Sequence, residues 1–174
     1  NTDLYVIGAR PAQGKTALLI NMANRAGVSS GLISAEQARD QIGLRMISLN
    51  GEISAHKLRN SSIDDEGWAK VTTSLSIMTD KKIHIYDKPA PTIIDVTREA
   101  RRIKFQHNIK ILYVDYIQRI KPSNSRLPKH EQIEEVVMSL KELARELEIP
   151  VVALSQVNRE VEKRENKRPG MSDL

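Results

Sequence analysis

The chain has 174 residues, 40% hydrophobic and 28% charged, which is the composition of one ordinary globular domain with its own core. Cysteine is absent, so disulfides and thiolate chemistry are excluded, and no apolar run approaches the roughly 18 residues of a membrane span. The net charge of +5 permits a nucleic-acid partner, whereas only 3% aromatic residues argue against base-stacking platforms. We expect a cytoplasmic protein that does not bind membranes.

The first candidate strand, residues 4–7, leads into a glycine-bearing turn that opens a helical pattern over residues 17–26. The turn has the P-loop pattern of Gly, four spacers and Gly-Lys-Thr, and it consists of Gly8, Ala9, Arg10, Pro11, Ala12, Gln13, Gly14, Lys15 and Thr16. Its backbone N–H groups and the N-terminus of the helix form a nest for anions. We therefore expect it to bind ATP, with Lys15 on the β- and γ-phosphates and the Thr16 hydroxyl on Mg²⁺. The alternative, a plain glycine turn, is disfavoured by the strand before it and the helix after it.

The next elements are a short strand and three helices. They are predicted over residues 32–34, 38–49, 54–59 and 64–75. Ser34 and Gln37 have the spacing of a capping box for the helix over 38–49. The lone tryptophan, Trp68, falls in the last of these helices, where we expect it to pack rather than to bind a ligand.

The second half of the chain continues the alternation of strands and helices. Strands are predicted over residues 83–86, 109–114 and 151–154, helices over 93–107 and 133–147, an exposed loop over 120–130, and a solvated helix and loop over 158–170. Thr92 is placed to cap the basic helix that reaches His107. Alternating apolar strands and helices with short connections predict an α/β fold with a parallel sheet.

Ligands on such sheets bind beyond the carboxyl ends of the strands, and Gly8, Glu36, Asp115 and Gln156 all fall there. Asp115 fits the Walker B role, a carboxylate beside Mg²⁺, better than that of an acid bonded to a loop amide. Glu36 could polarise the attacking water or could stabilise a helix N-terminus, and spacing alone favours neither. Gln156 could bond the γ-phosphate, although strand-end polar groups more often satisfy backbone. The four histidines lack metal-ligand spacing and receive no role.

Five short blocks of the sequence, taken together and in their order along the chain, form a specific pattern. They are Gly8-Ala9-Arg10-Pro11 to Thr16, Ser34-Ala35-Glu36, Tyr113-Val114-Asp115-Tyr116-Ile117-Gln118, Leu154-Ser155-Gln156 to Glu162, and Lys167-Arg168-Pro169 to Leu174. In this order, and over essentially the whole chain, they resemble the motifs of DnaB-type replicative DNA helicases. Gln13 and the segment 35–37 depart from the bacterial pattern, and these departures favour a bacteriophage member of the family.

The resemblance implies a RecA-like P-loop NTPase core, with a central, mostly parallel sheet flanked by helices. This core would belong to a homo-hexameric ring that encircles single-stranded DNA and unwinds duplex DNA 5′ to 3′. It implies ATP and Mg²⁺ as cofactors, Glu36 as the catalytic glutamate and Gln156 as the residue that couples the γ-phosphate to the DNA-binding loops. Arg45 joins the residues that hold the nucleotide, and a helicase loader and a primase are the implied partners.

The resemblance also implies that residues 1–174 form one part of the RecA-like ATPase core of a helicase. The N-terminal domain, the C-terminal strands, the DNA-binding loops and an arginine finger are expected outside them. We therefore expect these 174 residues alone to be a poor ATPase and a poor ring. Two alternatives stay open: a RecA-type recombinase, which shares the fold, and an ATP-binding scaffold or loader that does not translocate.

Overall fold

The structure is a computed structural model that describes residues 2–157, and its centre is a five-stranded sheet. All the strand pairs are parallel and the strand order is β1-β5-β4-β2-β3, which confirms the predicted parallel α/β sheet. The strands are β1 (Leu4–Ala9), β2 (Ser30–Ser34), β3 (Ile83–Tyr86), β4 (Ile111–Asp115) and β5 (Val151–Gln156). The expected solvated segment 158–170 lies outside the described residues.

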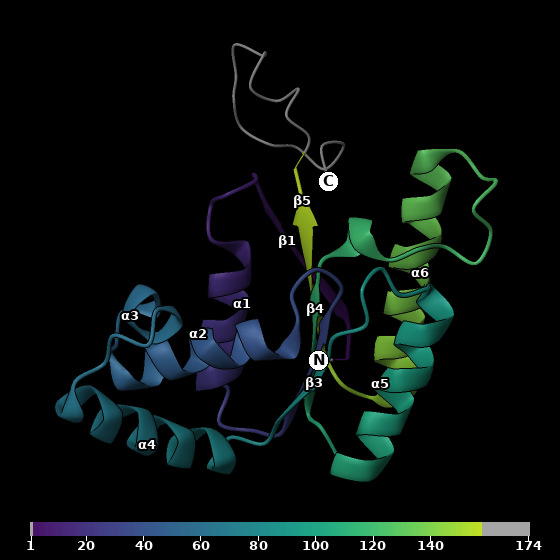
Figure 1. Cartoon of the computed structure of the whole chain (residues 1–174). Coiled ribbons are helices and arrows are strands. Elements are labelled where there is room, and N and C mark those ends of the chain that lie inside the picture. Colours follow the sequence, from purple (N-terminus) through teal and green to yellow (C-terminus); the bar gives the residue numbers. More distant parts are fainter. Residues whose placement is uncertain (1, 158–174) are drawn as a thin grey trace.

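Helices cover both faces of the sheet (Figure 1). On one face lie α1 (Lys15–Arg25), α2 (Arg39–Gly51), α3 (Ala55–Arg59) and α4 (Asp65–Asp80). On the other face lie α5 (Ile93–His107) and α6 (Lys129–Leu147). A short 3₁₀ helix, η1 (Ile117–Arg119), follows β4. Among the described residues, no helix combines the length and the apolar character that a membrane span requires.

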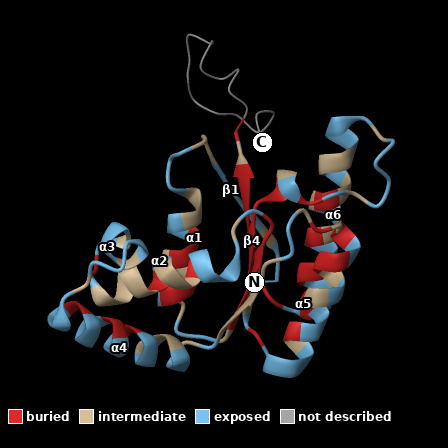
Figure 2. Cartoon of the chain, in the orientation of Figure 1, coloured by how far each residue is buried: buried red, intermediate tan, exposed pale blue. Residues whose placement is uncertain are grey.

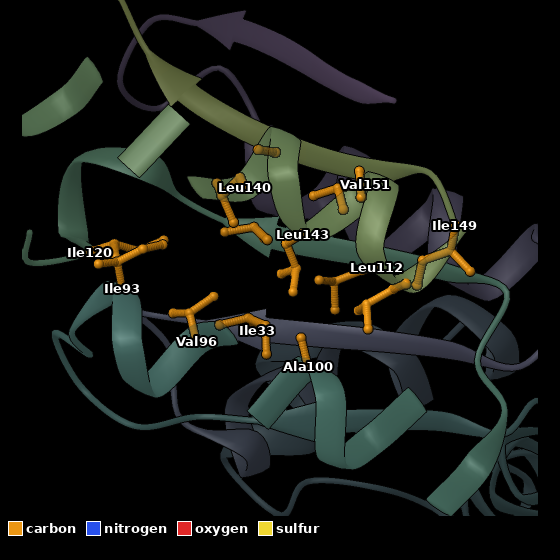
Figure 3. Packing of buried hydrophobic residues seen from close by; sticks show 14 of the residues in the cluster. Ile33, Ile93, Val96, Ala100, Leu112, Ile120, Leu140, Leu143, Ile149 and Val151 are labelled. Carbon is orange, nitrogen blue, oxygen red and sulfur yellow. The ribbon is translucent and has the colours of Figure 1, made fainter. Parts of the chain in front are cut away.

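The sheet separates two hydrophobic cores. Figure 2 shows buried residues concentrated in the sheet and on the helix faces turned toward it. In the larger core, seen in Figure 3, β-strand residues such as Ile33, Leu112 and Val151 meet α5 at Ala100 and α6 at Leu140. The central strands are buried along almost their whole length because helices cover them on both faces. The edge strand β1 is much more exposed.

Local capping signals decide where several helices begin. The Thr92 hydroxyl accepts from the Asp95 N–H at 3.1 Å, and the Asp95 carboxylate accepts from the Thr92 N–H at 3.0 Å, so α5 starts with a full capping box, as predicted for Thr92. The Asp64 carboxylate caps α4 by accepting from the Gly67 N–H at 2.8 Å. The side chain of Trp68 in that helix is 55% exposed, so the prediction that it packs is wrong.

The capping box predicted from Ser34 and Gln37 is also wrong. Ser34 is the last residue of β2, and α2 starts later, at Arg39, with Ala38 at its N-cap and no side-chain cap. The Ser34 hydroxyl does accept from the Gln37 N–H at 3.1 Å, but this bond closes a bend after the strand. Pairing of Ser34 with Asp115 of β4 holds it in the sheet, and tertiary pairing thus overrides the local signal.

Candidate nucleotide-binding site

The strands β1, β2, β4 and β5 end at one edge of the sheet because all four are parallel. Ala9 pairs with Gln156, and Ser34 pairs with Asp115, so the ends of neighbouring strands are level. Three of the predicted site residues, Glu36, Asp115 and Gln156, lie at or just after these ends, and the P-loop leaves β1 at the same edge. The prediction that they share one edge is confirmed.

The P-loop has the backbone of an anion nest. Gly14 stands at the N-cap of α1 with φ of 80°, a left-handed conformation that suits glycine, and no side chain caps this helix. Ala12 also has a positive φ, 60°. Inside the loop, the Arg10 N–H donates to the Gln13 side chain at 3.2 Å. The uncapped N-terminus of α1, with its positive dipole end, therefore faces the loop, and this is the arrangement that favours phosphate.

Thr16 and Asp115 meet directly across the edge. The Thr16 hydroxyl donates to Asp115 Oδ2 at 2.7 Å. Asp115 is 1% exposed, and its second oxygen, Oδ1, is buried without a hydrogen-bond partner among the described residues. Burial raises the pKa of the Asp115 carboxyl, and the neighbouring Glu36 adds to the rise, while the bond from Thr16 and the charge of Lys15 oppose it. A buried carboxylate oxygen beside a hydroxyl fits one side of a Mg²⁺ site.

The described residues hold no cluster of three or more metal-ligating side chains. Thr16 and Asp115 can therefore supply only part of a Mg²⁺ coordination shell. Magnesium in nucleotide sites is normally held in this way, by one or two protein ligands together with phosphate oxygens and water. The donor set thus fits a magnesium ion carried by a nucleotide better than an ion bound by the protein alone.

Lys15 reaches across the edge from the first turn of α1. Its ammonium donates to Gln156 Oε1 at 3.3 Å and lies 4.4 Å from the centre of the Tyr116 ring. Burial lowers the pKa of Lys15, and the carboxylates of Asp115 and Glu36 oppose this change. A half-buried ammonium in this position can form strong charge-assisted hydrogen bonds to a phosphate group.

Glu36 lies in the bend between β2 and α2 and is exposed. Since α2 begins at Arg39, Glu36 is not in the first turn of a helix, and the helix-stabilising alternative for this residue is wrong. The backbone around it is fixed, because the Ala35 N–H donates to the Asp115 carbonyl at 2.8 Å. The charge of Glu36 acts on both Asp115 and Lys15.

Arg45 is an exposed residue of α2 whose charge lowers the pKa of Asp115 against the larger effect of burial. It lines a hollow together with α1 residues, including Ala17 and Asn21. The structure therefore places Arg45 beside the helix that the P-loop opens. The side-chain hydrogen bonds described for Lys15 and Thr16 go to Gln156 and Asp115 and not to Arg45.

Two neighbours of this edge were not predicted as site residues. Tyr116, next to Asp115, lies under Lys15 and accepts a hydrogen bond from Arg119 at 3.1 Å. Gln118 of η1 bonds to the end of β5 at Ser155 and Gln156. Both belong to a block that resembles the helicase motifs, which is the one sequence signal that points to them. A separate cavity of about 360 Å³ lies on the η1 and α6 side, and among the described residues no P-loop residue lines it.

Known proteins resemble this chain in sequence and in fold. The family described as "DnaB-like helicase C terminal domain" matches residues 1–174. The chain is 36% identical to the replicative DNA helicase DnaB of Geobacillus stearothermophilus and 39% identical to that of Helicobacter pylori, over 99% of its length in both comparisons. It covers 39% and 36% of these two proteins, so it spans about two fifths of the length of the curated relatives it matches.

Solved structures agree with this family. The chain superposes on one that is described as an ATPase domain with a TM-score of 0.92 and 29% identity, covering 99% of this chain and 63% of the other. A second structure, described as a DnaB-like replicative helicase and its interactions with primase, gives a TM-score of 0.88 at 30% identity and covers 99% and 43%. These likenesses confirm the RecA-like fold. The chain belongs to the family of DnaB-like helicase C-terminal domains.

Proposed function

We propose that this chain is the ATP-hydrolysing core of a replicative DNA helicase, which moves along single-stranded DNA and unwinds duplex DNA 5′ to 3′. The observation that carries the proposal is the contact of the Thr16 hydroxyl with Asp115 at 2.7 Å, at the same sheet edge where Lys15 meets Gln156. It brings the phosphate-binding turn, the carboxylate and the strand-end glutamine into one site. Family membership supports the same function.

In this function, the P-loop residues from Gly8 to Thr16 hold the phosphates of ATP by their N–H groups. The Lys15 ammonium leaves Gln156 and binds the β- and γ-phosphates. Arg45, on the neighbouring helix α2, adds a positive charge on the side of α1. Mg²⁺, when bound, supplies charge neutralisation for phosphoryl transfer, and Thr16 and Asp115 are the residues that would hold it.

Glu36 is the residue that orients and polarises the attacking water. Its exposed carboxylate lies close enough to Lys15 and Asp115 to affect the pKa of both groups. Gln156 is the coupling residue. Because its side chain contacts Lys15 at 3.3 Å and its backbone ends β5, a change at the γ-phosphate is transmitted to the segment that follows residue 157.

The chain spans about two fifths of its curated relatives, and we propose that it supplies the ATPase core of a longer helicase. That protein acts as a homo-hexamer on single-stranded DNA and works with a loader and a primase. The solved relative described with its primase interactions supports the last of these partners.

The test is strand displacement by the full-length protein on forked duplexes. We expect ATP-dependent unwinding of forks with a 5′ tail and no unwinding of forks with only a 3′ tail. In Lys15→Ala we expect weaker ATP binding and loss of unwinding. Nucleotide-dependent filaments that pair strands would instead identify a recombinase. Tight ATP binding without unwinding or translocation would identify a scaffold or loader.

A further inference from the structure

The backbone at the end of β5, where Gln156 lies, is hydrogen-bonded on one side by a side chain and not by a strand. β4 and β5 pair from Leu112 and Val151 to Val114 and Ala153, and no β4 residue pairs with Ser155 or Gln156. On the other side, β5 stays paired with β1 up to Ala9 and Gln156. The paired residues of β4 and β5 therefore stop at Ala153, and the N–H and C=O of Gln156 have no backbone partner on the β4 side.

The side chain of Gln118 occupies that side. Its Oε1 accepts from the Gln156 N–H at 3.0 Å, and its Nε2 donates to the Gln156 carbonyl at 3.2 Å. In a strand, the N–H and C=O of one residue point to the same side, so one carboxamide can pair with both. The same Nε2 donates to the buried Ser155 hydroxyl at 2.8 Å. Gln118 thus substitutes for the missing strand residue.

We propose that Gln118 is a positioning residue for the coupling glutamine Gln156, an inference that rests on the function proposed for this site. The Gln156 side chain extends from a backbone that Gln118 and Ala9 hold from opposite sides, and its Oε1 accepts from Lys15 at 3.3 Å. Clamping that backbone fixes where the carboxamide can reach. The side-chain hydrogen bonds of Gln118 in the described structure go to Ser155 and Gln156 and not to Lys15 or the P-loop, so Gln118 acts through Gln156.

η1 connects this clamp to the carboxylate of the site. It follows Asp115 directly, with Tyr116 at its N-cap, and the ring of Tyr116 lies under the Lys15 ammonium. Gln118 and Asp115 are therefore only three residues apart in the chain. Asp115 contacts Thr16, and Gln118 contacts the backbone of Gln156. A shift of η1 moves the backbone of Gln156 and the ring below Lys15 together.

The test compares Gln118→Leu with wild type in the full-length protein, by hydrogen exchange and by steady-state ATP hydrolysis with single-stranded DNA. We expect exchange of the Gln156 amide to rise at least about tenfold, since its acceptor is lost, while the Val151 amide, which donates to the Asp3 carbonyl at 3.0 Å on the β1 side, stays protected. The DNA-stimulated kcat should fall about tenfold and KM for ATP should change less than about twofold, because positioning matters in the reaction more than in binding.

Epistasis separates positioning from a loss of folding. In a Gln156→Ala background, Gln118→Leu should lower kcat by less than about twofold further, because the side chain it positions is gone. The matched control is Gln132→Leu. Gln132 lines the same cavity as Gln118 and donates to the carbonyls of Ser125 and Leu127, but it makes no bond to β5. We expect it to lower the melting temperature and to leave kcat unchanged.

An equal loss of kcat in both backgrounds, or an equal loss in Gln132→Leu, would overturn the proposal. So would an unchanged kcat in a variant whose Gln156 amide exchanges freely. If wild-type protein binds no ATP and hydrolyses none, the proposed function fails. The exchange measurement then still tests the clamp, because it needs no nucleotide.

Discussion

Replacing Asp115 with asparagine should stabilise the protein and disable the site at the same time. The carboxyl is 1% exposed, its Oδ1 has no hydrogen-bond partner among the described residues, and burial raises its pKa. A raised pKa in the folded state means that the charged form opposes folding above that pKa and that the opposition disappears as the pH falls below it. Asparagine removes the charge at every pH and keeps an oxygen that can accept from Thr16.

The expected magnitude follows from two opposing terms. A buried, incompletely partnered charge costs roughly 2 kcal/mol or more, and each unit of raised pKa corresponds to about 1.4 kcal/mol. Exchanging a charge-assisted bond from Thr16 for a neutral one loses about 1 kcal/mol. The net expectation for Asp115→Asn is a gain of about 1 kcal/mol in the free energy of unfolding, or about 2–4 °C in melting temperature for a chain of this size.

The assay is denaturant or thermal unfolding with and without Mg·ATP. At a concentration of about 100 times Kd, the ligand should add about 2.7 kcal/mol to wild type. In Asp115→Asn it should add less than about 1 kcal/mol, because a metal ligand is lost, and EDTA should reduce the wild-type gain in the same way. The control is Asp95→Asn. The carboxylate of Asp95 pairs with Lys88 and accepts from Thr92, which hold its pKa far below the usual range, so this variant should lose stability and keep the full ligand effect.

The reasoning about Asp115 would be refuted by an asparagine variant that is less stable than wild type without ligand and gains full stability from Mg·ATP. Asp115 would then be a structural acceptor for Thr16 and not a metal ligand.

Three further predictions concern Lys15, Glu36 and His84. Lys15→Ala should weaken ATP binding about 10- to 100-fold, since one charge-assisted bond contributes about 1.5–3 kcal/mol, and unchanged affinity in a titration with a fluorescent ATP analogue would argue against its phosphate role. Glu36→Gln should keep that affinity and lower kcat by about 10²- to 10⁴-fold, and normal hydrolysis would remove Glu36 from the reaction. His84 stacks on His107 at 3.7 Å, and burial, His107 and Arg102 lower the pKa of His84. A base whose folded pKa is depressed favours folding above its unfolded pKa, and this contribution is lost as the pH falls through the folded pKa, so stability should decline from about pH 7 to about pH 5. His84→Gln should flatten that decline, whereas the exposed His130→Gln should not; equal slopes in all three proteins would contradict this.

The sequence was sufficient where a local pattern and a strand end coincide. The P-loop spacing with a strand before it and a helix after it predicted the nest at Gly14, and the apolar run of β4 predicted where Asp115 would stand. Parallel strands then bring their ends to one edge without further information. Thr92 was predictable for the same reason, because its capping partner Asp95 is only three residues away.

The failures involve partners that are distant in the sequence. Ser34 and Gln37 have the capping-box spacing, yet Ser34 pairs with Asp115 in the sheet, and no local pattern records that competition. Gln118 is an uncharged residue with no periodicity, and its partners at the end of β5 follow it by 37 and 38 positions. The order of the strands was not predicted either. Periodicity shows that strands are buried, and their neighbours depend on the packing of the whole chain.

The strand order has a consequence for how this domain is made. β1 carries the P-loop, and among the described strands its only hydrogen-bonded neighbour is β5, which lies at the other end of the described chain. At a synthesis rate of about 5–20 residues per second, roughly 7–30 seconds separate the appearance of these two strands on the ribosome. During that time β2 can already pair with β3 and β4, while the described partner of β1, strand β5, has not yet been synthesised. Among the described strands, β1 is therefore the last to gain a neighbour in the sheet, and a nascent chain interrupted before residue 151 carries a P-loop whose strand has no hydrogen-bonded partner among them.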